Sequence, residues 1–135
     1  MNPLYKDAIY VNRATSSLVD AINGKEISEP LTEHRAWTSG EKLFAEARKN
    51  GCDFALIFSQ YEKLEYWALA SEIVILDEDG KRVTRYRFSH LQQIPGRSRL
   101  RNDLTVISTG SRLPNEYIRS YVLVKTPDFL QQEPS

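Results

Sequence analysis

Residues 51–80, with the sequence GCDFALIFSQYEKLEYWALASEIVILDEDG, carry the strongest secondary-structure signal in the chain. Within residues 53–59, large apolar side chains recur at every second position, which is typical of a β-strand buried mainly on one face. Residues 65–76 are largely apolar on both alternating faces. We therefore expect a central strand there, with a bulge near Ser71 and Glu72 where the apolar run is interrupted.

The sequence on the C-terminal side of this stretch predicts more strands. Residues 77–80, Asp-Glu-Asp-Gly, have strong turn chemistry and predict a hairpin into a return strand over residues 81–88. After a polar, arginine-rich loop, two further short strands are expected at residues 104–108 and 117–124. Together these segments predict about five strands that pair antiparallel.

Helical signals lie on the N-terminal side, within residues 1–51. Residues 39–50 have apolar side chains at helical spacing, and Thr38 with Glu41 three residues later is a capping-box pattern that marks a helix start. A second helix is expected over residues 15–23. The sequence therefore predicts an α+β fold, a small curled antiparallel β-barrel of about five strands flanked by two N-terminal helices.

Length and composition bound the class of protein. The 135 residues match one ordinary domain, so we expect a single domain over residues 1–135, with a barrel core over about 53–125 and a frayed tail over 126–135. The 41% hydrophobic and 27% charged residues exclude a disordered or fibrous chain. Apolar runs are far shorter than the roughly 20 residues that cross a bilayer, and the N-terminus lacks a signal-peptide pattern. Because Cys52 is the one cysteine in the sequence, an internal disulfide is excluded. With two histidines besides, the chain has few of the ligands that zinc prefers, so we expect no zinc site. We expect a cytoplasmic protein without membrane contact, metal or cofactor.

Charge is unevenly distributed, although the formal net charge is zero. Residues 1–80 carry 8 basic and 14 acidic side chains, whereas residues 81–125 carry 10 basic and 2 acidic ones. Eight of those ten cations are arginine, whose planar guanidinium binds phosphate oxygens in pairs and stacks on flat rings. Such a stretch is typical of a nucleic-acid binder, unless the arginines pair with the acids of the first 80 residues across the fold.

The chain also shows a layout known from one group of RNA-binding modules. A helix ends at Gly51, Asp53 opens an apolar strand, and a short polar loop leads to a strand with an aromatic side chain near its start. Over about residues 37–125 this resembles PUA-like modules, in particular their EVE and ASCH branches, although Cys52 separates the glycine and aspartate that are adjacent in that family. The resemblance implies a β-barrel that recognises RNA, or DNA with a modified or flipped base, in a cleft. Some ASCH relatives are reported as hydrolases or nucleases.

A cleft that recognises a base needs flat side chains for stacking, polar groups for the base edge and cations for the phosphates. For stacking we expect Trp37, Tyr61 and Trp67. For the base edge we expect Ser59 at a strand end and Glu72 within the apolar strand. The alternatives are that Trp67 fills the core and that Glu72 pairs with an arginine of the return strand, because a buried carboxylate must be paired, hydrogen-bonded or protonated.

Phosphate contacts are expected from two groups of arginines. Arg85 and Arg87 share one face of the return strand. Arg97, Arg99 and Arg101 alternate along the following loop, so an extended backbone would point all three the same way, along a row of phosphates. Binding through several phosphates is steeply salt-dependent. The alternative is a solvated surface loop.

No catalytic residue is assigned from the sequence. His90 follows Ser89, but no Ser-His-Asp order is present, and Cys52 beside a strand start most often packs in a core. The predicted function is that of a nucleic-acid-binding module, with RNA or DNA as the partner. Two alternatives stay open: a protein-interaction or accessory domain that binds an acidic partner, and a small hydrolase or nuclease on the same scaffold that uses Glu72, His90 or an arginine–lysine pair.

Overall fold

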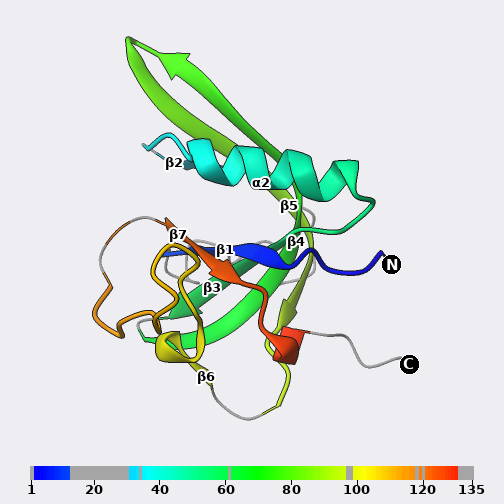
Figure 1. The fold of residues 1–135 in the computed structure, drawn as a ribbon. Helices are drawn as coiled ribbons and strands as arrows, with labels where there is room; N and C mark the ends of the chain where they lie inside the picture. Colours follow the sequence, from blue (N-terminus) through cyan, green and yellow to red (C-terminus); the bar gives the residue numbers. More distant parts are fainter. Residues whose placement is uncertain are drawn as a thin grey trace.

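The computed structural model describes residues 2–12, 31–33, 35–60, 62–96, 99–117, 119 and 121–130. These residues form seven strands, one α-helix and two short 3-10 helices (Figure 1). In chain order they are β1 (Asp7–Val11), β2 (Leu31–Glu33), α2 (Thr38–Lys49), β3 (Ala55–Gln60), β4 (Lys63–Glu78), β5 (Lys81–Gln93), β6 (Arg99–Leu100), η2 (Arg101–Asp103), β7 (Tyr121–Lys125) and η3 (Asp128–Leu130).

The strands form one open, mixed sheet in the order β2-β5-β4-β3-β1-β7, and β6 continues the line of β5 beside β4. β1 and β3 are parallel, with Ile9 beside Leu56, and the other neighbours are antiparallel. Within the described residues no backbone pairing joins β2 to β7, the two ends of the order. The predicted closed, antiparallel barrel preceded by two helices is therefore wrong.

The open sheet results from β1, a strand that the sequence pattern did not reveal. It lies between β3 and β7, and its residues 8–11 are completely buried. A parallel strand covered on both faces appears in the sequence as a short apolar run, which periodicity cannot distinguish from part of a helix. Because β1 occupies the free edge of β3, β7 pairs with β1 and extends the sheet, instead of closing it.

Both faces of the sheet carry a hydrophobic core. The helix-side core includes Phe44 and Ala47 of α2 and Phe54 and Phe58 of the sheet. The opposite core, which we call the loop-side core, is covered by the segment after β6 and by η3. Its buried members include Trp67, Leu104, Leu113 and Leu130. Figure 1 shows α2 on one side of β1 and the loops after β6 on the other. β3 is therefore buried on both faces, not mainly on one as its alternation predicted.

The long hairpin of β4 and β5 confirms the strongest sequence signal. Its turn lies at Asp79 and Gly80, both with positive φ, of 49° and 79°, which matches the twist of a tight hairpin turn. The register shifts between Ala70 and Glu72, which confirms the predicted bulge. β4 lies between β3 and β5, as expected of a strand that is apolar on both faces. The far end of the hairpin extends past α2 (Figure 1).

The C-terminal segments differ more from the predictions. β5 continues to Gln93, so the first part of the predicted polar loop is strand. The strand expected at residues 104–108 is reduced to isolated bridges at Thr105 and Val106. The strand expected at 117–124 begins later, as β7. The segment before it instead folds back over the sheet, where Leu104 and Leu113 gain burial in the loop-side core.

The predicted helix over residues 39–50 is confirmed as α2, whereas the one predicted over 15–23 lies outside the described residues. The capping box is wrong. α2 begins after Trp37, without a side-chain cap, and the Glu41 carboxylate Oε2 instead accepts a hydrogen bond from the backbone N–H of Ile75 at 3.2 Å. Glu41 therefore joins α2 to β4. At the other end, Gly51 has φ +70°, a conformation that favours glycine after a helix.

A buried threonine joins the start of α2 to β5. The Thr84 hydroxyl accepts a hydrogen bond from the Trp37 backbone N–H at 2.9 Å and donates one to the Arg35 carbonyl at 2.6 Å. Thr84 itself is completely buried. The hydroxyl thus ties the residues that precede α2 to β5 and fixes the chain at residues 35–37.

Replacing Thr84 with valine tests this joint. Thr84→Val keeps the shape but leaves the Trp37 N–H without a partner, so we expect the free energy of unfolding to fall by about 1–3 kcal/mol. Thr84→Ser keeps the hydroxyl and should lose less. Urea denaturation monitored by tryptophan fluorescence measures both. Equal stability of the wild-type and valine proteins would show that the bridge contributes nothing.

Candidate functional site

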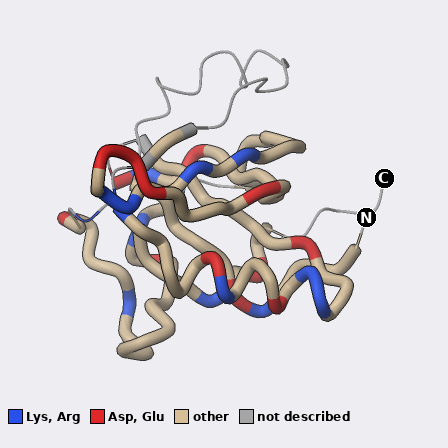
Figure 2. The backbone as a smooth tube through the Cα atoms, turned by 90° about the horizontal axis from the view of Figure 1, so that it is seen from above, with Lys and Arg blue, Asp and Glu red and all other residues tan. Residues whose placement is uncertain are grey.

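Of the five arginines predicted to contact phosphates, the four that the structure describes do not gather at one place. On the hairpin, Arg85 forms an ion pair with Glu78, and Nε of Arg87 lies 3.7 Å from Oε1 of Glu72. Figure 2 shows basic and acidic positions interspersed over the described backbone, without one basic face. The pair with Arg87 also accounts for Glu72, in the structural role considered as the alternative from the sequence.

The described members of the other predicted row of arginines do not share one strand. Arg97 lies outside the described residues. Arg99 is in β6, with its Cζ 4.6 Å from the centre of the Phe129 ring. Arg101 begins η2 and is only 8% exposed. The two arginines therefore have different surroundings and do not form a common line for phosphates.

The structure also buries three of the five groups predicted to contact a base. Trp37 is 0% and Trp67 1% exposed, because both fill the cores. Ser59 is 2% exposed, and its Oγ lies 2.6 Å from the Tyr10 hydroxyl. Tyr61 lies outside the described residues. Neither indole nor Ser59 offers a surface to a base in this arrangement, so the predicted cleft is not formed by these three residues.

A different hollow combines the same chemistry. It has a volume of about 980 Å³ and lies where β1 ends and where α2 and β7 begin. We call it the tyrosine–arginine pocket. Its lining consists of Asn12, Arg35, Ala36, Tyr117, Arg119, Tyr121 and Val122. None of these residues is acidic, and in the described part of the chain neither arginine forms an ion pair with a carboxylate.

Sequence reasoning missed this site, although one signal was present. Tyr117, Arg119 and Tyr121 alternate in the sequence YIRSY, so an extended chain places the two rings and the cation on one side. The contributions of Asn12 and Arg35 come from distant parts of the chain. No local pattern could have assigned them to the same pocket.

Tyr121 is held in a column of stacked rings. Its ring centre lies 5.1 Å from that of Trp37, and Trp37 in turn stacks on Tyr86 at 4.9 Å. The Tyr117 hydroxyl donates a hydrogen bond to the Tyr121 carbonyl at 2.8 Å. Burial raises the pKa of the Tyr117 and Tyr121 hydroxyls above the usual value for tyrosine. Both side chains are therefore neutral near pH 7 and add no negative charge.

Arg101 and Asn12 fix the pocket wall from behind. Arg101 Nη1 donates to the carbonyls of Asn115 and Tyr117, at 2.7 and 3.0 Å, and Nη2 donates to Asn12 Oδ1 at 3.1 Å. The Asn12 amide Nδ2 donates to the carbonyls of Tyr117 and Arg119, at 3.1 and 3.0 Å. The two side chains thus hold the main chain that carries Tyr117 and Arg119.

Arg101 is also a buried cation without a counter-charge. Its hydrogen-bond acceptors are neutral, and no carboxylate pairs with it in the part of the chain that the structure describes. Burying an unpaired charge is costly, and the low dielectric strengthens its field. That field raises the positive potential at the neighbouring pocket and favours an anionic ligand.

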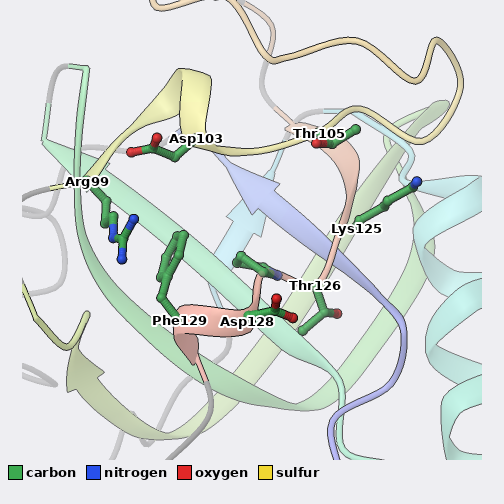
Figure 3. A pocket seen from close by; sticks show the side chains of 8 residues that line it. Arg99, Asp103, Thr105, Lys125, Thr126, Asp128 and Phe129 are labelled. Carbon is green, nitrogen blue, oxygen red and sulfur yellow. The ribbon is translucent and has the colours of Figure 1, made fainter.

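A second, smaller pocket carries charges of both signs. It has a volume of about 410 Å³, and we call it the mixed-charge pocket (Figure 3). Its charged lining consists of Arg99, Asp103, Lys125 and Asp128, with Phe129 as an apolar wall. The two carboxylates would repel a phosphate, so this pocket suits a polyanion less well than the tyrosine–arginine pocket does.

Comparisons with known proteins give no family. No protein-family model, curated protein or solved structure matches the chain. The resemblance to PUA-like modules therefore stays a prediction. Across the described segments, no helix has both the length and the apolar character needed to span a bilayer. The same segments contain no group of three or more His, Cys, Asp or Glu side chains that could hold a metal ion.

Replacing Arg101 tests its hold on the pocket wall. In Arg101→Met the carbonyls of Asn115 and Tyr117 lose the hydrogen bonds from Arg101, so amide hydrogen exchange over residues 113–121 should accelerate by about fivefold or more, the effect of about 1 kcal/mol per hydrogen bond. Arg112→Met, at an exposed position, is the matched control. Unchanged protection of residues 113–121, or equal acceleration throughout the chain, would contradict the assigned role.

Proposed function

We propose that the protein binds nucleic acid by holding an unpaired base in the tyrosine–arginine pocket. The partner is RNA, single-stranded DNA or DNA with a base flipped out of the duplex. The observation that carries this proposal is a hollow of about 980 Å³ whose described lining includes two tyrosines and two arginines and no acidic residue. Rings for stacking and cations for the backbone are the two requirements of single-strand binding.

The rings and cations have separable roles. Tyr121 is held from behind by Trp37, so it offers a rigid surface on which a base stacks. Arg35 and Arg119 are exposed and reach the phosphates on either side of that base. The field of Arg101 strengthens the attraction without contact. The chain positions these groups before the ligand arrives, which lowers the entropic cost of binding.

The pocket has few free hydrogen-bonding groups with which to distinguish one base edge from another. Asn12 is the one side-chain amide in the described lining, and both its oxygen and its nitrogen are engaged by Arg101 and by the carbonyls of Tyr117 and Arg119. Stacking alone tolerates every base, because every base has a π-face. We therefore propose binding with little sequence preference, in the cytoplasmic location that the sequence leads us to expect.

Salt dependence tests the phosphate contacts. With two arginines engaged, the logarithm of the association constant for a single strand should fall with the logarithm of salt at a slope of about −1.4, or about sevenfold between 50 and 200 mM. In the double variant Arg35→Gln, Arg119→Gln the slope should approach zero. Arg112→Gln, outside the pocket, should keep the wild-type slope. Fluorescence anisotropy with a labelled oligonucleotide measures all three, and an unchanged slope in the double variant would contradict the proposal.

Tyr121 tests the stacking. Tyr121→Leu should weaken oligonucleotide binding by about 5- to 150-fold, the effect of losing 1–3 kcal/mol of stacking on one base. Tyr121→Phe keeps the ring and should bind within about twofold of wild type, because the hydroxyl is not needed for stacking. Thermal melting verifies that both variants fold. Equal affinities of the leucine and phenylalanine variants would rule out stacking on Tyr121.

The same pair of variants separates the alternative functions expected from the sequence. An acidic protein partner would use Arg35 and Arg119 but would not require the ring of Tyr121. A hydrolase or nuclease based on Glu72 or His90 would act away from this pocket, because neither residue lines it. No described observation favours either alternative over base binding.

A further inference from the structure

The mixed-charge pocket is lined by charged groups of both signs. Arg99 and Lys125 line it together with Asp103 and Asp128. Among the described residues, none of these four side chains forms an ion pair with another. Oppositely charged neighbours that do not neutralise each other are free to bind a ligand that carries both charges.

Arg99 is fixed and available. Its Cζ lies 4.6 Å from the centre of the Phe129 ring, and Figure 3 shows the guanidinium beside that ring. Its Nε is buried without a hydrogen-bond partner, and within the described chain the rest of the guanidinium makes no hydrogen bond either. A guanidinium held against a ring and left unsatisfied is preorganised to bind a carboxylate with two parallel hydrogen bonds.

The acidic side of the pocket is available as well. Asp103 Oδ2 already accepts the backbone N–H of Leu100 at 2.9 Å. Asp128 has no hydrogen-bond or ion-pair partner in the described part of the chain, and it lies on η3 next to Phe129. η3 is anchored because Leu130 is completely buried in the loop-side core. Asp128 is therefore the acceptor for a ligand cation.

We propose that the mixed-charge pocket binds a free α-amino acid, with the carboxylate on Arg99 and the ammonium group on Asp128. The lining carries two cations and two carboxylates, so a zwitterion matches it better than a simple anion or a simple cation does. The volume of about 410 Å³ lies within the usual range for small-ligand sites. Pro127 and Phe129 form the apolar part of the wall, which favours an apolar side chain.

This proposal is independent of nucleic-acid binding, because the two pockets share no lining residue. A peptide terminus is a competing ligand, since it carries one of the two charges. Charge-deleted analogues of one amino acid distinguish it from the free zwitterion without any change to the protein.

The test is isothermal titration calorimetry of the full chain with free L-amino acids, beginning with L-leucine, and with N-acetyl-L-leucine and L-leucinamide. We expect L-leucine to bind, and each analogue to bind about tenfold more weakly or worse, the loss expected for one charge-assisted hydrogen-bonded group. Absence of binding by every free amino acid would overturn the proposal. Binding of one analogue as tight as that of L-leucine would also overturn it, and would indicate a terminus site.

Two variants assign the contacts. In Arg99→Gln, L-leucine and L-leucinamide should bind equally, because the partner of the carboxylate is gone. In Asp128→Asn, L-leucine and N-acetyl-L-leucine should bind equally. Arg82→Gln, at an exposed hairpin position, is the control and should leave every affinity unchanged. L-Leucine binding that is unaffected by both pocket variants would overturn the assignment of this pocket.

Discussion

The parallel pair of β1 and β3, covered on both faces, is the constraint on which the rest of the structure depends. Parallel neighbours cannot be joined by a tight turn, so the chain must cross over the sheet between them, and α2 lies on that crossover. The crossover gives the sheet its helix-side core. The other face then needs a cover, which the segment after β6 and η3 provide. Because a core covers each face of the central strand pair, the sheet buries its apolar side chains without closing into a barrel.

The same constraint places the candidate site. β1 ends, and α2 and β7 begin, at one end of the sheet, and these three points supply the lining of the tyrosine–arginine pocket. In open sheets with parallel strands, ligands typically bind beyond the carboxyl ends of the strands. Arg101 lies behind this pocket as a buried cation whose hydrogen-bond acceptors among the described residues are neutral. A fold optimised for stability alone would pair or remove such a charge, so its retention is consistent with an anionic ligand.

How much of the fold the sequence predicts depends on how far apart in the chain the interacting residues lie. The β4–β5 hairpin, its bulge and α2 are encoded by neighbouring residues, and they were predicted correctly. β1 depends on partners about 50 residues later in β3 and over 100 later in β7, so its five residues carry no local signal. The barrel prediction failed because it had no place for this strand.

The candidate site likewise combines features that neighbouring residues encode with features that depend on distant residues. The predicted site combined rings with arginines, as the tyrosine–arginine pocket does, but Trp37 and Trp67 are large apolar groups that the two cores bury. Arg101 looked like part of an exposed row, yet its partner Asn12 lies 89 residues away in sequence. Burial and pairing over such distances decide which arginines are available, and a single sequence does not contain that information.

Photo-crosslinking tests base binding at the tyrosine–arginine pocket most directly. A single-stranded oligonucleotide that carries iodouracil is bound to the full chain, irradiated, and mapped on the protein by mass spectrometry. Stacking in the pocket predicts adducts on Tyr121 or Tyr117, within residues 117–122. Adducts confined to the basic positions of the β4–β5 hairpin, or no adduct at all, would contradict it.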